Sequence, residues 1–408
     1  MQYGDRRSFL HQTALTAATA ASFGNLLPSD AWAGGPAKLD TIVRKPLQKK
    51  YRAAAIGSTG QGDYGHRMDV ALTDVPNIEF VAIADSNAEG LKKAGQRNRV
   101  GRLYADFHEM LDKEEIDVVS VGTRHSALHE EMILAAAKAG LHVYCEKPLA
   151  IDLASADRMI AACDGAGVKL CVALPNRASL AIAEAAKMVN EGRIGKILRI
   201  RANGKDDRRG GGEDLIVLGY HVLDLMCLFA GDPLWTFAQI QEGQRDAKPT
   251  DAKAASEPLG PVAGDCLAAM FGFPNQVHGY LESHRGLEGS SERFCIEIYG
   301  SEGIIASRSM SDVVWFEGPV LNPAKPHRWQ VVSTPAWDAV ADHDLWSRRA
   351  LFHDLLQAAE ENREPFSSGK QARWVQEMIQ GIYASHLAQA RITLPLKQRE
   401  HPLGAVDE

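Results

Sequence analysis

Glu146 and Lys147 form a charged pair at the end of the apolar run 141–145 (LHVYC), and Pro148 follows them. A short apolar run is typical of a strand in a parallel sheet, and a proline after it directs the chain into a loop. Lys147 is therefore predicted to lie at the carboxyl end of a strand. In open α/β sheets this edge binds ligands, so a lysine there is well placed to meet a substrate. Taken alone, however, the three residues are better explained as an ordinary charged turn.

A second stretch, 57–65 (GSTGQGDYG), has the composition of a turn that binds phosphate groups. It follows the strand candidate 52–56, and glycines at such a position let the backbone approach a pyrophosphate at the start of a helix. The pattern G-x-G-x-x-G begins only at Gly60, and Thr59 stands where the second glycine after the strand usually falls. A plain glycine-rich turn is the alternative interpretation. The cofactor contacts that we expect from this turn come from Gly57, Thr59, Gly60, Gln61 and Gly62.

Asp85 stands at the end of a second predicted strand, 78–84, after a helix-like segment that reaches about Leu72. An acidic residue at the tip of this strand is suited to bind the 2′-hydroxyl of an adenosine ribose. Such an acidic residue usually follows the glycine turn by roughly 20 residues, and Asp85 follows Gly57 by a longer spacing. The same carboxylate repels a 2′-phosphate, so NAD is favoured over NADP as the cofactor. If the glycine turn is ignored, a helix-capping aspartate explains Asp85 equally well.

Strand and helix patterns alternate through the first half of the chain. The further strands are predicted at 116–121, 141–145 and 168–173, and the helices between them at 125–139 and 152–165. Strands separated by helices of this length indicate a doubly wound parallel sheet, which is a Rossmann-type α/β fold. The carboxyl ends of parallel strands share one edge, so Lys147 is expected on the same edge as the glycine turn.

Length and composition indicate a soluble globular protein with two domains. The chain has 408 residues, more than one hydrophobic core usually holds, and 45% of them are hydrophobic and 24% charged. The net charge of −7 gives no electrostatic basis for binding nucleic acid. The six cysteines include no C-x-x-C pair, so we expect buried free thiols and no metal site.

The amino terminus has the features of an export signal. Arg6 and Arg7 form a twin-arginine pattern, the uncharged segment 13–27 follows, and 31–33 (AWA) is a candidate cleavage site. We expect residues 1–33 to be a signal peptide for the periplasm or another exported location, and residues 34–48 to be a linker. The signal segment is too short and too polar for a stable membrane span. Its resemblance to twin-arginine signals implies export of a folded protein, often with its cofactor bound.

Three segments together resemble one enzyme family. They are the glycine turn with Asp85, the segment 139–149 (AGLHVYCEKPL) and the segment 210–225 (GGGEDLIVLGYHVLDL). Between about Tyr51 and Leu396 the chain thereby resembles the glucose-fructose oxidoreductase and inositol dehydrogenase-like enzymes (Gfo/Idh/MocA), whose hallmark is the Glu-Lys-Pro triplet. The resemblance implies an NAD-binding Rossmann domain at 49–175, a C-terminal substrate and oligomerisation domain at 176–396, and a tail at 397–408.

The implied C-terminal domain is an α/β domain with a large, open, mainly antiparallel sheet, and the residue pattern agrees with it. Strands are predicted at 264–273, 276–284, 293–299 and 303–307, and helices at 345–361 and 371–388. A polar insert at 242–264 either covers the site or is disordered.

The resemblance also assigns roles to single residues. It makes Lys147 the acid/base that takes the hydroxyl proton when a carbinol becomes a carbonyl. A crowded sheet edge beside a cationic nicotinamide lowers the pKa of such a lysine. Glu146 is assigned to the surroundings of the cofactor, which Thr123 and His125 also border. Arg124 stands where many family members have a proline, which leaves the detail of this loop open.

His221 is the second catalytic candidate. It lies in the otherwise apolar stretch 220–229, where a lone histidine is more often a core residue, but the resemblance makes it bind or polarise the reacting hydroxyl. Sugar-alcohol dehydrogenases of the family commonly have an aspartate four residues earlier, where this chain has Val217. Either Asp214 or Asp224 replaces that aspartate, or His221 acts without one. Further substrate candidates are Asp214, Tyr220 and Arg177, although a surface arginine explains the last equally well.

The sequence thus predicts an exported, NAD-dependent oxidoreductase that interconverts a hydroxyl and a ketone on a sugar or glycoside, as a homo-oligomer built through the open sheet. One alternative keeps NAD tightly bound and recycles it, as in sugar-sugar oxidoreductases or oxidation-assisted glycosidases. Another is a non-catalytic sugar-binding protein on the same fold. The sugar, its reacting hydroxyl, the reaction direction and the number of subunits are left open.

Overall fold

The structure is a computed structural model that describes residues 39, 42, 44–287, 294–308, 312–321, 329–332 and 340–404. The expected signal peptide at 1–33 lies outside these residues, as do the start of the expected linker and the last four residues of the expected tail. Within the described ranges, no helix has both the length and the apolar character that a membrane crossing requires.

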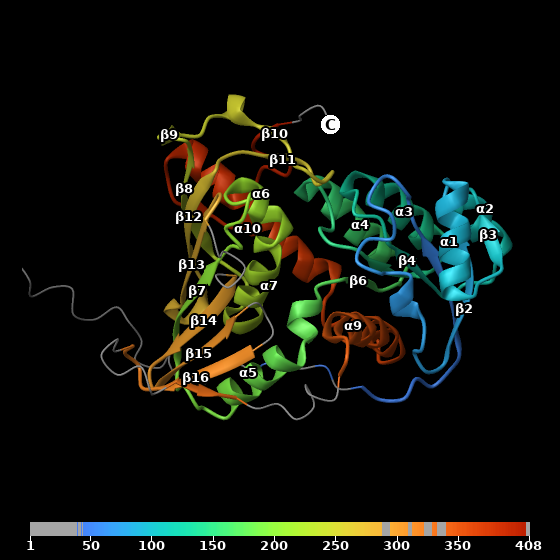
Figure 1. Ribbon diagram of the computed structural model, residues 1–408, viewed down its shortest axis with the longest axis horizontal. Coiled ribbons are helices and arrows are strands. Elements are labelled where there is room, and N and C mark those ends of the chain that lie inside the picture. The colour runs from blue at the N-terminus through green and yellow to red at the C-terminus, as the bar shows by residue number, and fades with distance from the viewer. Residues whose placement is uncertain are drawn as a thin grey trace, which may run out of the picture. The chain divides into compact units, whose positions relative to one another are not determined.

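A six-stranded parallel sheet forms the first half of the described chain (Figure 1). Its strands lie in the order β3-β2-β1-β4-β5-β6, so the order reverses between β1 and β4. This reversal is the switch point at which doubly wound sheets bind ligands, and the predicted Rossmann-type fold is confirmed. The strands are β1 (Tyr51–Ile56), β2 (Ile78–Ala84), β3 (Arg102–Tyr104), β4 (Val118–Val121), β5 (His142–Cys145) and β6 (Leu170–Val172).

Helices cover both faces of this sheet, and one of them comes from the far end of the chain. Along β1, Ala54 and Ile56 belong to the core cluster that includes α3 and α4, whereas Ala53 and Ala55 belong to the cluster that includes Phe352 of α9. Successive residues of a strand point to opposite faces, so α9 lies opposite α3 and α4. The helices are α1 (Ala88–Asn98), α2 (Phe107–Lys113), α3 (Ser126–Lys138), α4 (Leu153–Gly165) and α9 (His343–Glu360).

The prediction of a helix-like segment after the glycine turn is wrong. Residues 64–69 form turns, and only the short 3-10 helix η1 (Val70–Leu72) follows them. Positive φ angles interrupt any right-handed helix here, and they occur at Gly60, Gly62, Asp63, Gly65 and Arg67. Helix α9 contacts η1 and covers this face of the sheet in place of the predicted helix.

A ten-stranded, mainly antiparallel sheet forms the second half, as predicted. Among the described strands of this sheet, β7 and β13 alone pair in parallel. Figure 1 shows α5, α7 and α10 on the side of this sheet that faces the first domain. The strands are β7 (Ile197–Asn203), β8 (Trp235–Glu242), β9 (Arg245–Asp246), β12 (Cys266–Gly272), β13 (His278–His284), β14 (Cys295–Gly300), β15 (Gly303–Arg308), β16 (Asp312–Glu317), β17 (Trp329–Val331) and β18 (Ile392–Thr393), and the helices are α5 (Leu180–Asn190), α6 (Gly212–Val217), α7 (Gly219–Ala230) and α10 (Gly369–Ala388).

The polar insert at 242–264 is built from short elements. They are β9, η3 (Pro249–Asp251), β10 (Lys253–Ala254) and β11 (Pro261–Val262). The amide of Ser126, at the start of α3, donates to the Pro258 carbonyl at 3.2 Å. Arg124 also lies 3.5 Å from Glu257. The insert therefore reaches the ligand-binding edge of the first sheet. Of the two predictions for this segment, a cover over the site and a disordered stretch, the structure agrees with the cover.

A buried ion pair joins the two domains. Arg177, in the 3-10 helix η2 (Pro175–Ala178), donates from Nε to Asp224 Oδ2 at 2.9 Å, and its Nη2 lies 2.7 Å from Oδ1. Both side chains are almost fully buried, and Arg177 also donates to the carbonyl of Phe366. Asp224 lies on α7, so the pair ties the end of the first domain to the helices of the second.

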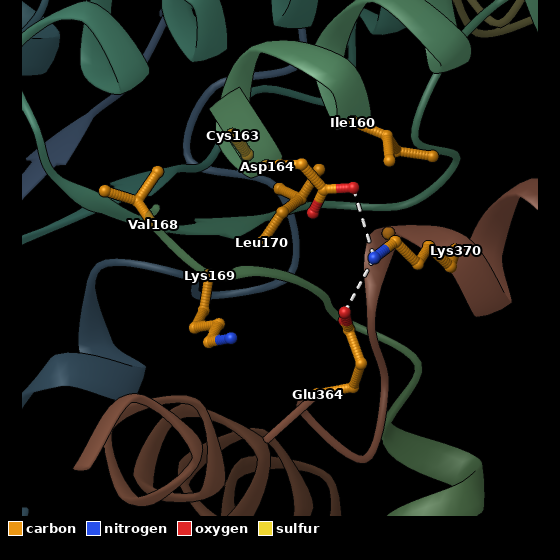
Figure 2. A pocket seen from close by; sticks show the side chains of 9 residues that line it. Ile160, Cys163, Asp164, Val168, Lys169, Leu170, Glu364 and Lys370 are labelled. Atoms are coloured by element: carbon orange, nitrogen blue, oxygen red, sulfur yellow. Dashed lines mark hydrogen bonds and ion pairs between the residues drawn. The ribbon is translucent and has the colours of Figure 1, made fainter. Parts of the chain in front are cut away.

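We predict that Asp224→Ala lowers the free energy of unfolding by about 3–5 kcal/mol, because the Arg177 guanidinium stays buried without its charge partner. Urea unfolding followed by circular dichroism measures the loss. Asp164→Ala is the matched control, since it removes an exposed partner of Lys370, which keeps Glu364 (Figure 2). That control should cost less than about 1 kcal/mol. Equal losses in the two variants would contradict a stabilising role of the buried pair.

Candidate active site

The predicted site residues follow the carboxyl ends of four neighbouring strands. Gly57 follows β1, Asp85 follows β2, Thr123 comes two residues after β4, and Glu146 and Lys147 follow β5. All four strands are parallel, so these residues meet at one edge of the sheet, as the strand pattern indicated.

Two cavities open along this edge. The first has a volume of about 310 Å³ and lies beside the glycine turn. Its lining includes Gly57, Ser58, Gln61, Asp85, Ser86, Phe107, Leu128 and Met132. The second has a volume of about 290 Å³ and lies between the first sheet and the C-terminal domain. It is lined by His66, Lys147, Pro175, Asn176, Arg209, Val217, Leu218, His221, Glu257, Phe294, Asp344 and Arg348.

The first cavity has the arrangement of an adenosine site. Asp85 is 2% exposed, and its carboxylate accepts hydrogen bonds from Thr59 Oγ1 at 2.6 Å and from the Asn87 amide at 2.9 Å. The aspartate thus holds the glycine turn while it borders the cavity. At Gly57 there is no room for a side chain, because a Cβ atom would lie 2.4 Å from the Tyr64 ring.

The β4 loop braces the glycine turn from the other side. Thr123 is fully buried, its hydroxyl donates to the Gln61 carbonyl, and it accepts the His125 amide at 3.1 Å. Neither Thr123 nor His125 is among the residues that line the two cavities. In this structure the Thr123 side chain supports the turn. Gly60 and Gly62 supply positive φ angles to the same turn.

Lys147 lies at the centre of the second cavity's charged groups. It is 5% exposed, and its ammonium donates to the Val217 carbonyl at 2.8 Å. That carbonyl ends helix α6, where helical carbonyls lack a partner within the helix. The backbone of Val217 therefore contacts the lysine at the position where the family resemblance leads us to expect an aspartate.

Glu146, beside Lys147, is a fully buried carboxylate. It accepts the Lys147 amide and the His66 amide, both at 3.0 Å, and Arg348 Nη1 lies 3.7 Å from its Oε2. Burial raises the pKa of Glu146, but Arg348, His66 and Lys147 outweigh burial and hold the pKa well below its usual range. The site therefore contains a fixed buried negative charge.

The two catalytic candidates both have weakened proton affinity. Burial lowers the pKa of Lys147, opposed by Glu146 and assisted by Arg348. Burial, with the nearby charge of Lys147, lowers the pKa of His221 well below its usual value. His221 is 8% exposed, and among the described residues its buried Nδ1 has no hydrogen-bond partner. A lysine with reduced proton affinity beside a neutral imidazole can accept a proton and polarise a hydroxyl.

Several residues predicted to contact substrate do not line this cavity. Asp214 is fully buried, and its carboxylate accepts a hydrogen bond from the Ser283 hydroxyl at 2.7 Å. It belongs to α6, whereas His221 belongs to α7, so the two side chains do not share a helix. The Tyr220 hydroxyl donates to the Ala372 carbonyl at 2.9 Å. Arg177 and Asp224 bind each other. The structure therefore corrects these expectations, and no aspartate side chain among them replaces the one missing at Val217.

Other lining residues were not predicted from the sequence. They are His66, Asn176, Arg209, Glu257, Phe294, Asp344 and Arg348. Arg209 follows β7, Glu257 lies in the insert, and Arg348 lies on α9, so they are scattered over the chain. The spacing of Asp344 and Arg348, four residues apart on a helix, was their only signal in the sequence.

The described residues offer no cluster of three or more His, Cys, Asp or Glu side chains that suits a metal ion. All six cysteines are free thiols, five of them buried and Cys266 partly exposed. The polar groups of the site are instead hydrogen-bond donors, acceptors and acid/base groups, and the glycine turn suits a nucleotide.

The fold is that of an oxidoreductase family with an NAD-binding Rossmann domain. Two models of one family match the chain, the oxidoreductase family with an NAD-binding Rossmann fold (GFO_IDH_MocA) at residues 51–174 and the GFO/IDH/MocA C-terminal domain at residues 182–306. The chain belongs to the Gfo/Idh/MocA family.

Sugar dehydrogenases are among its relatives. D-Apiose dehydrogenase of Paraburkholderia graminis is 34% identical over 194 residues, covering 45% of this chain and 51% of the relative, so the match spans about half of that protein. Levoglucosan dehydrogenase of Pseudarthrobacter phenanthrenivorans is 29% identical over 61% of this chain and 72% of the relative. A solved structure of levoglucosan dehydrogenase with NADH and levoglucosan has a TM-score of 0.70 at 23% identity, covering 85% of this chain and 100% of that one.

We predict that Asp85→Asn weakens the preference for NAD over NADP by at least about tenfold, because the variant loses the charge that repels a 2′-phosphate. Fluorescence titrations with NADH and NADPH measure the ratio of dissociation constants. Asp63→Asn is the control, since Asp63 lies in the same turn, accepts the Gly60 amide and does not line the cavity. An unchanged ratio in Asp85→Asn would refute the ribose role.

Proposed function

We propose that this protein is an NAD-dependent dehydrogenase that interconverts a hydroxyl and a ketone on a sugar or glycoside. The observation that carries the proposal is Lys147, buried at the wall of a polar cavity with His221 on the same wall. Relatives named D-apiose, levoglucosan and myo-inositol 2-dehydrogenase support a carbohydrate substrate. The cavity also suits a sugar, because it combines many hydrogen-bonding groups with one aromatic ring, Phe294.

In the oxidation direction, Lys147 accepts the hydroxyl proton and His221 hydrogen-bonds to the same oxygen as the carbonyl forms. Bound NAD would supply the hydride acceptor, so that the carbinol loses one proton and one hydride. Gly57, Gln61 and Asp85 would hold the adenosine half of the cofactor, and the fixed negative charge of Glu146 lies next to Lys147. In reduction Lys147 returns the proton.

A version with a retained, recycled cofactor is the second candidate. The contacts of the insert with Ser126 and Arg124 favour it, since they lie at the edge of the first sheet beside the glycine turn. The twin-arginine pattern at 6–7 supports export, and free NAD is scarce outside the cytoplasm.

We further propose that the protein is an exported homo-oligomer, for which the partly exposed apolar residues Phe237 and Tyr280 on the outer face of the second sheet offer a contact surface.

We predict that Lys147→Ala lowers kcat at least about 100-fold while NADH binding changes little, because the variant loses the proton acceptor and keeps the nucleotide cavity. Turnover is measured with NAD on a panel containing D-apiose, levoglucosan and myo-inositol, and binding by NADH fluorescence. Lys169→Ala is the control, as Lys169 is a partly exposed lysine that donates to Asn362 at 3.4 Å and lines neither of the two cavities. Full activity of Lys147→Ala would overturn the proposal.

The two cofactor modes differ in what the purified protein carries. We denature the protein, purified without added nucleotide, and quantify released NAD and NADH by absorbance and mass spectrometry. A stoichiometric amount supports internal recycling and directs the substrate search to paired sugars and glycosides. An empty protein that binds NADH in a titration supports a freely exchanging cofactor.

A further inference from the structure

Arg348 is a buried cation that reaches the second cavity from α9. Its Nε and Nη2 donate to the two oxygens of Asp344 at 2.9 and 3.2 Å, which fixes the plane of the guanidinium. Its Nη1 lies 3.7 Å from Glu146 Oε2 and 3.8 Å from Met68 Sδ. The arginine is 3% exposed and lines the cavity beside Lys147.

Anchoring of α9 does not explain this residue. The helix is already held against the first sheet by an apolar face that includes Leu351, Phe352 and Leu355. Its neighbour Arg349 makes a surface ion pair with Asp74 at 2.9 Å. Burying a guanidinium costs far more than burying an apolar side chain of similar size. The place of Arg348 is therefore best explained by the group that it faces, the Glu146 carboxylate.

We propose that Arg348 is a positioning residue for proton transfer, which balances the buried charge of Glu146 and so sets the electrostatic surroundings of Lys147. The inference rests on the proposed function, because it takes Lys147 as the group that exchanges the proton. Arg348 acts through Glu146, and Asp344 holds it in place.

The direction of the effect follows from the charges around Lys147. Glu146 and Glu257 favour the charged ammonium, and Arg348 and Arg209 disfavour it. The other charged or titratable groups that line the cavity are His66, which follows the glycine turn, His221 from α7, Glu257 from the insert and Asp344 from α9. When Arg348 loses its charge, the carboxylate is unopposed on this side, and Lys147 holds its proton to higher pH. Less of the enzyme then has a free amine at neutral pH.

We expect Arg348→Gln to move the ascending limb of the pH dependence of kcat/KM for alcohol oxidation upward by about one pH unit. Activity then falls about tenfold below the limb and recovers at high pH. Arg348→Lys keeps the charge and should return most of the limb toward the wild-type position. Arg349→Gln, next on the same helix, should leave the profile unchanged. Circular dichroism and NADH titration verify that each variant folds and binds cofactor.

Two results would overturn the role of Arg348. An equal loss of kcat at every pH would indicate a structural part only, and a raised KM with an unshifted profile would indicate direct contact with substrate. Lys147→Ala, measured in parallel, separates this inference from the proposed function. If that variant is active, the proposed function fails; if it is inactive while Arg348→Gln keeps the wild-type profile, only the role of Arg348 fails.

Discussion

The site depends on keeping one carboxylate, Glu146, ionised with no exposure to water. Transfer of a charge into the protein interior costs several kcal/mol unless other groups compensate it. Here the compensation comes from separate parts of the chain, namely the His66 amide just after the glycine turn, Lys147 next in sequence and Arg348 on α9. The carboxylate therefore requires β5, the glycine turn and α9 to lie together, and this convergence also builds one wall of the second cavity.

Helix α9 connects the stability of the fold to the chemistry of the site. The chain after the glycine turn forms no α-helix and leaves one face of the first sheet open. The apolar side chains of α9 cover this face. Asp344 and Arg348, in the first half of the same helix, reach the cavity. A helix from the C-terminal part of the chain thus completes the first domain, so neither the domain's core nor its site forms from the first half alone.

The backbone supplies a contact to Lys147 at the position where the family resemblance leads us to expect a carboxylate. Val217 cannot offer a carboxylate, but helix α6 ends at this residue and leaves its carbonyl without a helical partner. Lys147 donates to that carbonyl, so the lysine is held in place without a further negative charge beside those of Glu146 and Glu257. This arrangement agrees with a lysine of reduced proton affinity. The buried ion pair of Arg177 with Asp224 lines neither cavity and belongs to the domain junction.

The sequence by itself determined five of the six strands of the first sheet but not the short edge strand β3. It also determined the meeting of Gly57, Asp85 and Lys147 at one edge, and the family, because these follow from local patterns and parallel strand order. Only the tertiary structure decided which polar residues share a cavity. Positive φ angles replaced the helix expected after the glycine turn, and a break between α6 and α7 separated Asp214 from His221. Arg348 reaches Glu146, and Glu257 reaches Arg124, from distant segments of the chain. Such contacts depend on packing between elements, which local residue patterns do not encode.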